Sequence, residues 1–168
     1  MVRTQSRFRN LIKGAVAGLL ATFPMTLFMR TAWRMLPPQE KYPLPPRQLT
    51  NRLVQELEPP VRLNQDRLTA LTYLLHFLFG AATGALYGVL EDRVPLHDDT
   101  KGPLMGMAVW AGSYLGWIPL LRMLPPATRH PWQRNVLMIV THLIWGLALG
   151  TFTRMLKSKK GAYSIPLE

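Results

Sequence analysis

The sequence predicts an all-α integral membrane protein: a four-helix bundle that forms a single transmembrane domain over residues 1–168. Hydrophobic residues make up 48% of the chain and charged residues only 17%, which is low for a soluble surface. The apolar residues also gather in blocks, and a bilayer core about 30 Å thick is crossed by about 20 helical residues. We therefore expect four spans, at about 11–33, 68–90, 102–122 and 135–156. A soluble bundle would need a polar face that these segments lack.

The first span is bordered by basic residues and a double proline. Pro24 lies in its middle and predicts a kink. The span ends in "RMLPP" (34–38), where Arg34 is placed to reach the headgroups and the prolines stop the helix. We expect Arg34 to contact phosphate headgroups or the acidic residues of a partner.

A short amphipathic helix is expected in the first loop, at 47–58, because prolines bracket the segment and its leucines share one helical face. Such a helix typically lies in the headgroup plane. Capping the mouth of the bundle and docking on a partner are alternatives. Its Arg47 and Arg52 join Arg34 as candidate contacts for lipid or a partner.

The second and fourth spans each carry one histidine followed by two glycines. The groups are His76 with Gly80 and Gly84, and His142 with Gly146 and Gly150. Residues four and eight positions apart share nearly one helical face. Two imidazoles that face each other across a space cleared by glycines would suit a bis-histidine haem b, with its iron as the only metal. The same spacing also describes close helix packing, or a space for a pigment, quinone or lipid.

The third span resembles the first. Gly112 takes the place of Pro24, and "RMLPP" recurs at 122–126, so Arg122 is a further candidate contact for lipid or a partner. The alignment continues on both sides of this motif. Residues 13–38 align with 101–126 at a shift of 88, and 71–84 align with 137–150 at a shift of 66.

The two shifts predict a tandem duplication of a helix hairpin. Repeat one covers about 13–90, with an insertion within 44–67, and repeat two covers about 101–156. A unit of two spans returns the chain to its starting side, so both hairpins should be parallel repeats inserted the same way up. The basic tails favour both termini in the cytoplasm, because the long first loop counts little.

Composition also limits the function. The chain has no cysteine, and its net charge of +11 lies in tails and loops, where it favours a lipid bilayer with anionic headgroups over nucleic acid. All acidic residues lie outside the apolar spans, which argues against proton-coupled transport and acid–base catalysis. We expect a non-catalytic accessory or scaffold subunit of a larger membrane complex, with protein partners. A haem b electron carrier, or a protein that binds pigment, quinone or lipid, is the alternative.

Two stretches carry a resemblance to a known group. "EKYPLPPRQLT" (40–50), followed by "HFLFGAATGALYG" (76–88), resembles uncharacterised bacterial four-span inner-membrane proteins of the domain-of-unknown-function kind, which are distantly similar to the YagU-like proteins. The resemblance implies a bacterial inner membrane. It implies no activity.

Overall fold

The structure is a computed structural model that describes residues 2–58 and 63–158, and the regular secondary structure of these residues is helical, with no strand. The prediction of an all-α protein is therefore confirmed for this part of the chain. The α-helices are α1 (Val2–Trp33), α2 (Pro45–Leu57), α3 (Gln65–Leu90), α4 (Asp98–Ala111), α5 (Ile118–Leu120) and α6 (Trp132–Ser158). Short 3-10 turns lie at Pro38–Glu40, Glu91–Arg93 and Ala127–Arg129, and a π-helical segment lies at Gly112–Trp117.

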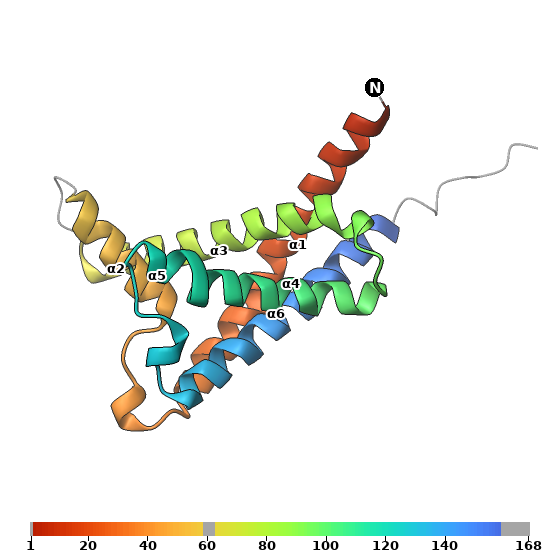
Figure 1. Cartoon of the computed structure of the whole chain (residues 1–168). Helices are drawn as coiled ribbons and strands as arrows, with labels where there is room; N and C mark the ends of the chain where they lie inside the picture. Colours follow the sequence, from red (N-terminus) through yellow and green to blue (C-terminus); the bar gives the residue numbers. More distant parts are fainter. Residues whose placement is uncertain (1, 59–62, 159–168) are drawn as a thin grey trace, which may run out of the picture.

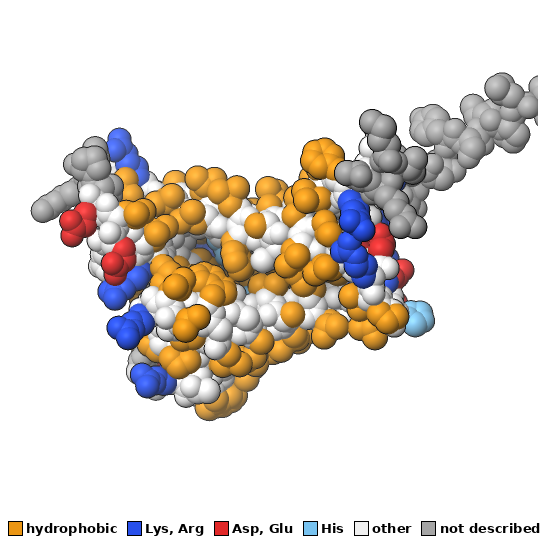
Figure 2. Space-filling view, turned by 45° about the horizontal axis from the view of Figure 1, so that its top comes forward, with side chains coloured by type: hydrophobic (Ala, Val, Ile, Leu, Met, Phe, Trp, Pro, Cys, Tyr) orange, Lys and Arg blue, Asp and Glu red, His pale blue; other side chains and the backbone are white. Residues whose placement is uncertain are grey.

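Three helices are long and apolar enough to cross a membrane: Gln5–Trp33, Gln65–Arg93 and Trp132–Lys157. Large apolar side chains on their outer faces are exposed: Phe23 is 67% exposed and Leu147 is 55% exposed. Figure 2 shows hydrophobic side chains over the middle of the molecule and Lys and Arg gathered towards its two ends. This distribution is the one expected for a chain surrounded by lipid.

The segment expected as the third span in the sequence is helical but interrupted. It consists of α4, the π-helical segment and α5, and Gly116 within it has non-helical angles (φ −109°, ψ −111°). Pro119 explains the break, because its ring has no N–H and would clash with the carbonyl of Leu115 in a regular α-helix. The irregularity predicted at Gly112 begins at that residue. α1, in contrast, stays a continuous helix through Pro24.

The helices are arranged as two hairpins that point the same way. α1 packs against α3 and α6, and α4 packs against α6. In Figure 1, α2, α5 and their adjoining loops lie at one end of the bundle, which we call the α2 end. The start of α1, the connection from α3 to α4 and the end of α6 lie at the other end.

Glycines bring the backbones of each hairpin into direct contact. A Cβ placed on Gly18 of α1 would overlap the carbonyl oxygen of Gly80 and lie 2.8 Å from the Cα of Gly84. In the other hairpin a Cβ on Gly106 of α4 would overlap the carbonyl oxygen of His142. In the sequence alignment Gly18 matches Gly106, but Gly80 matches Gly146. The contact of α4 with α6 is therefore displaced by four residues, or one helical turn, from the contact of α1 with α3.

The loops at the α2 end are held together by a buried arginine near the start of α6. Arg134 is 4% exposed and donates to the carbonyl oxygens of Glu40, Tyr42 and Pro43, at 2.7, 3.1 and 3.1 Å. Its guanidinium also lies 3.6 Å from the centre of the Tyr42 ring. The Tyr42 hydroxyl hydrogen-bonds Nδ1 of His130 at 3.0 Å, and these two residues align at the shift of 88 positions.

Ionic contacts fix the opposite end. Lys157 of α6 pairs with Glu91 at 2.8 Å and with Asp92 at 2.9 Å, just beyond α3. The Nζ of Lys13 donates to the carbonyl oxygen of Leu156 at 2.6 Å, which connects α1 to α6. Both hairpins are thus joined at each end of the bundle, and they leave a space between them.

Candidate functional site

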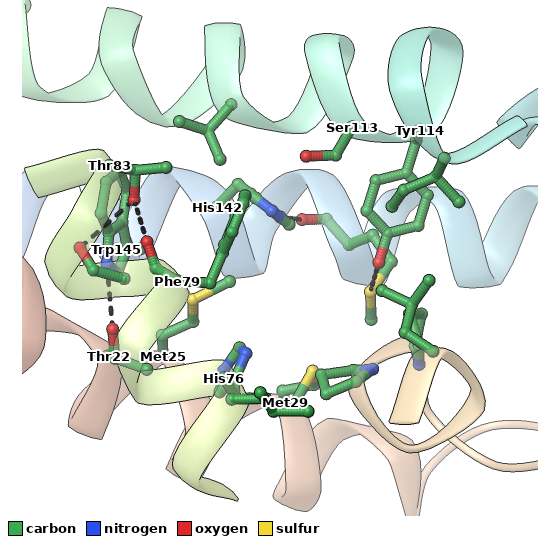
Figure 3. A pocket seen from close by; sticks show the side chains of 18 of the residues that line it. Thr22, Met25, Met29, His76, Phe79, Thr83, Ser113, Tyr114, His142 and Trp145 are labelled. Atoms are coloured by element: carbon green, nitrogen blue, oxygen red, sulfur yellow. Dashed lines mark hydrogen bonds between the residues drawn. The ribbon is translucent and has the colours of Figure 1, made fainter. Parts of the chain in front are cut away.

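An apolar cavity of about 360 Å³ lies between the two hairpins, close to the α2 end (Figure 3). Residues of α1, α3, α4, α6, the π-helical segment and α2 surround it. The apolar lining includes Met25, Met29, Leu75, Phe79, Val109, Ile118 and Met138. The polar lining consists of Thr22, His76, Thr50, Thr83, Ser113, Tyr114, His142 and the indole of Trp145. Few polar groups in a mostly apolar wall are typical of a pocket for a small molecule.

His76 of α3 is a residue of the cavity lining whose side chain has an unmade hydrogen bond. Its Nε2 is buried and has no hydrogen-bond partner among the described residues. The ring instead meets the edge of Phe77, with 6.2 Å between ring centres. A buried polar atom without a partner costs about 1–3 kcal/mol. A bound molecule with one hydrogen-bonding group near this nitrogen would remove that cost.

His142 of α6 is more constrained. Its Nδ1 lies 2.7 Å from the carbonyl oxygen of Met138. A carbonyl only accepts, so Nδ1 carries the proton and Nε2 is left as an acceptor or metal ligand. Tyr114 stands edge-on to the ring, with 5.9 Å between centres and an interplanar angle of 88°. The imidazole is 6% exposed, and its orientation is fixed from two sides.

The structure brings both predicted histidines to one cavity, but most of the predicted glycines lie elsewhere. Gly80 borders the cavity, whereas Gly84, Gly146 and Gly150 do not. Gly84 lies against the backbone of α1, and Gly146 and Gly150 lie against Gly102 of α4. These glycines therefore serve close helix contacts, which is the alternative that the spacing left open.

The π-helical segment supplies a wall that sequence reasoning missed. Ser113, Tyr114 and Trp117 from this segment line the cavity, and the Tyr114 hydroxyl donates to Sδ of Met138 at 3.2 Å. Wide helical turns of this kind are frequent at functional sites. The sequence analysis used Gly112 as its signal, and this residue indicated an irregularity without indicating which side chains would line a cavity.

Trp145 of α6 closes the cavity on the side of α1. Its Nε1 lies 3.3 Å from both the carbonyl oxygen of Gly18 and Oγ1 of Thr22. The side chain is 2% exposed. No motif in the sequence singled it out, because its partners lie more than a hundred residues away.

α2 covers the cavity from outside the bundle. Leu49 and Leu53, on the predicted apolar face, line the cavity together with Pro45, Pro46 and Thr50. Figure 2 shows the surface hollowed next to this helix. The apolar face of the helix is therefore directed at the cavity, as the capping alternative anticipated.

The four arginines predicted to contact lipid or a partner lie in different surroundings. Arg34 and Arg47 line a second cavity, of about 310 Å³, between α1, α2 and α3. Arg52 is exposed on α2 and pairs with Glu56 at 3.6 Å. Arg122 is exposed after α5 and has a left-handed backbone conformation (φ 55°).

The fold is that of a helical protein with membrane-spanning helices and an internal cavity, and comparison with known proteins adds a family. The family model described as "protein of unknown function (DUF1440)" matches residues 25–151. The chain belongs to this family, which confirms the predicted relation to an uncharacterised domain-of-unknown-function group. No curated protein and no solved structure matches the chain.

Proposed function

We propose that this protein is a non-catalytic membrane protein that holds a small, largely apolar molecule in the cavity between its hairpins. The main support is that His76, whose buried Nε2 has no hydrogen-bond partner among the described residues, lines a cavity of about 360 Å³ with apolar walls. Pockets of about 300–1,000 Å³ with a few convergent polar groups are typical of small-molecule sites. The ligand should carry one carbonyl or hydroxyl group for His76.

The polar lining favours binding over chemistry. The cavity is bordered by hydroxyls, imidazoles and an indole, and its described lining contains no carboxylate, lysine or arginine. The fixed tautomer of His142 offers Nε2 as a second acceptor on the opposite wall. A molecule with hydroxyl groups on a flat or extended apolar body, such as the reduced (quinol) form of a quinone, fits this arrangement, because a hydroxyl can donate to Nε2 of His142.

The same proposal includes the placement in the membrane. The segment from α4 to α5 also crosses the membrane, as the third of four spans along the chain, and the two hairpins are parallel repeats in a bacterial inner membrane. In favour of this arrangement, the helical path from Asp98 to Leu120 lies alongside α6, and both hairpins point the same way. α2 then lies at the headgroup level, and the basic tails place both termini in the cytoplasm.

Haem b is a second candidate ligand, because both imidazoles border one cavity. A hydrogen bond from Nδ1 to a backbone carbonyl, as His142 makes, is typical of a ligating histidine. The optical spectrum of the purified protein tests this candidate. A Soret band that is lost in both His76→Ala and His142→Ala would establish haem, and a colourless protein would exclude it. The role as an accessory or scaffold subunit stays a prediction.

The proposed site is tested by filling the cavity. Ser113 is 4% exposed and lies in the cavity wall, so Ser113→Phe should displace the ligand. Leu147→Phe on the outer face of α6 is the matched control, since Leu147 is 55% exposed. Organic extracts of the purified proteins would be compared by mass spectrometry. We expect an apolar compound at near-equal molar amount in wild type and control, reduced at least tenfold in Ser113→Phe. Equal amounts in all three proteins would refute the site.

A further inference from the structure

The second cavity, of about 310 Å³, has a character unlike that of the first. It lies between the end of α1, the start of α3 and α2, and three arginines line it. The basic residues are Arg30, Arg34 and Arg47. Hydroxyl groups surround them, from Thr26, Thr69, Thr72 and Tyr73. We call this cavity the arginine pocket.

The three arginines have no carboxylate partner. The lining of the pocket contains no Asp or Glu, and none of the three forms an ion pair within the described residues. Arg30 donates from Nη1 to the Tyr73 hydroxyl at 2.6 Å, and Arg47 donates to Oγ1 of Thr69 at 2.9 Å. These hydrogen bonds hold both guanidinium groups in place but leave their charge uncompensated. The Arg34 side chain makes no hydrogen bond with the described residues and is exposed.

Such a cluster has the chemistry of a phosphate site. Like charges held in one pocket repel each other unless an anion neutralises them. Guanidinium groups bind phosphate oxygens through paired hydrogen bonds. The Tyr73 hydroxyl accepts from Arg30 and can donate its own proton to an anion. Basic pockets between transmembrane helices, near the membrane surface, are typical sites for anionic lipid headgroups.

The arginine pocket adjoins the apolar cavity. Met29, Pro46 and His76 line both. Thr69 lies in the second turn of α3 and His76 about two turns further along, so the two cavities follow one another along α3 from the α2 end inward. A molecule with an anionic head and an apolar chain would occupy both cavities at once.

We propose that the arginine pocket binds the phosphate group of an anionic amphiphile, whose apolar chain passes His76 into the apolar cavity. The position of the chain rests on the proposed function above. The position of the phosphate does not, because it depends only on the three arginines. The phosphate could belong to a membrane glycerophospholipid or be free in solution, and the experiment separates these sources.

The experiment uses the purified full chain in mild detergent and three probes. They are phosphatidylglycerol with brominated chains, diacylglycerol with the same chains, and inorganic phosphate. Native mass spectrometry measures bound lipid, and bromine quenching of Trp145 reports a chain in the apolar cavity. The Trp145 signal is obtained as the difference between wild type and Trp145→Phe. This tryptophan suits the purpose because it lines that cavity and is 2% exposed.

We expect phosphatidylglycerol to bind at least tenfold more tightly than diacylglycerol and to quench Trp145. Arg34→Gln should weaken phosphatidylglycerol about tenfold, as for a lost hydrogen bond between charged groups. Arg34→Lys should restore part of the loss. Arg52→Gln is the matched control, because Arg52 is an exposed arginine outside the pocket, and it should bind as wild type does.

Three other outcomes would contradict part or all of the proposal. Equal affinity for the two lipids, with no effect of Arg34→Gln, overturns the phosphate site even if Trp145 is quenched. Preference for phosphatidylglycerol without quenching of Trp145 supports the phosphate site and overturns the position of the chain. Displacement of phosphatidylglycerol by equimolar inorganic phosphate overturns the amphiphile as the ligand.

Discussion

Two glycines that occupy equivalent places in the sequence should respond in opposite ways to the same substitution. Gly84 of α3 and Gly150 of α6 each end the pattern of a histidine with two glycines. A Cβ on Gly84 would overlap the carbonyl oxygen of Gly14 and lie 2.6 Å from the Cα of Gly18. A Cβ on Gly150 would meet nothing closer than the Cα of Gly102, at 3.5 Å. A methyl group therefore does not fit at Gly84, whereas it fits at Gly150.

The magnitude follows from two opposing terms. Alanine is favoured over glycine in a helix by about 1 kcal/mol. In Gly84→Ala the cost of overpacking outweighs this gain. Non-bonded carbon atoms in contact are about 3.5–4.0 Å apart, so α1 and α3 must separate by about 1 Å to accept the new methyl group. Overpacking of this kind costs about 1–3 kcal/mol, and the neighbouring glycine contacts loosen with it. In Gly150→Ala only the gain remains. We expect the two variants to differ by about 2 kcal/mol in the free energy of unfolding.

The assay is reversible unfolding in mixed micelles of dodecyl maltoside with increasing SDS, followed by far-UV circular dichroism. Gly84→Ala should shift the midpoint to less SDS, and Gly150→Ala should leave it unchanged or raise it. Gly112→Ala serves as a control for helix propensity alone, since a Cβ there meets nothing within 4 Å. Equal destabilisation by Gly84→Ala and Gly150→Ala would refute the one-turn difference between the hairpins.

Three further predictions concern the two ends of the bundle. Burial lowers the pKa of His130 below its ordinary value of 6.5. The unfolded chain therefore takes up a proton more readily than the folded one, and the protein should lose stability as the pH falls below about 6.5. His130→Gln should remove this part of the pH dependence of the thermal unfolding temperature. Arg134→Met should lower the free energy of unfolding by about 3 kcal/mol, because three carbonyls lose a charged donor. Lys157→Met should cost about 1–2 kcal/mol, since it leaves the mostly buried Glu91 without its cation. The SDS titration described above measures the stability of both Arg134→Met and Lys157→Met. Arg52→Gln is the control for both, and it should change stability by less than about 0.5 kcal/mol, because its ion pair is exposed.

Much of the secondary structure could be predicted from local sequence. The segment expected at 47–58 is the helix Pro45–Leu57, and the span expected at 68–90 is the helix Gln65–Leu90. These helices follow from apolar runs and from prolines, whose effects are local. The span expected at 102–122 ends at Leu120 and is broken at Gly116. Gly112 and Pro119 indicate such a break, but the turn at which it opens depends on tertiary packing.

The candidate site was predictable only in part, because its decisive contacts are distant in sequence. His76 and His142 were identified because a polar ring in an apolar span is unusual. Trp145 was missed, because its partners Gly18 and Thr22 lie 127 and 123 residues earlier and no local pattern indicates them. The one-turn displacement of α4 along α6 was also hidden. Glycine spacing specifies that helices approach closely, but not which of several equivalent glycines meet.

The site depends on the differences between the two hairpins. The displacement of one turn places the His142 carbonyl against α4, and the ring of His142 lies beside Tyr114. His76, its aligned residue, lines both cavities, and its buried Nε2 has no hydrogen-bond partner among the described residues. The insertion in the first hairpin provides α2, which covers the apolar cavity and adds Arg47 to the arginine pocket. The break at Gly116 in the second hairpin turns the π-helical wall inward. A strictly symmetric pair of hairpins would have one symmetric site on its axis or two equal sites related by that axis. These three departures all act on the same side of the bundle, and for that reason we expect one ligand per chain, bound beside His76.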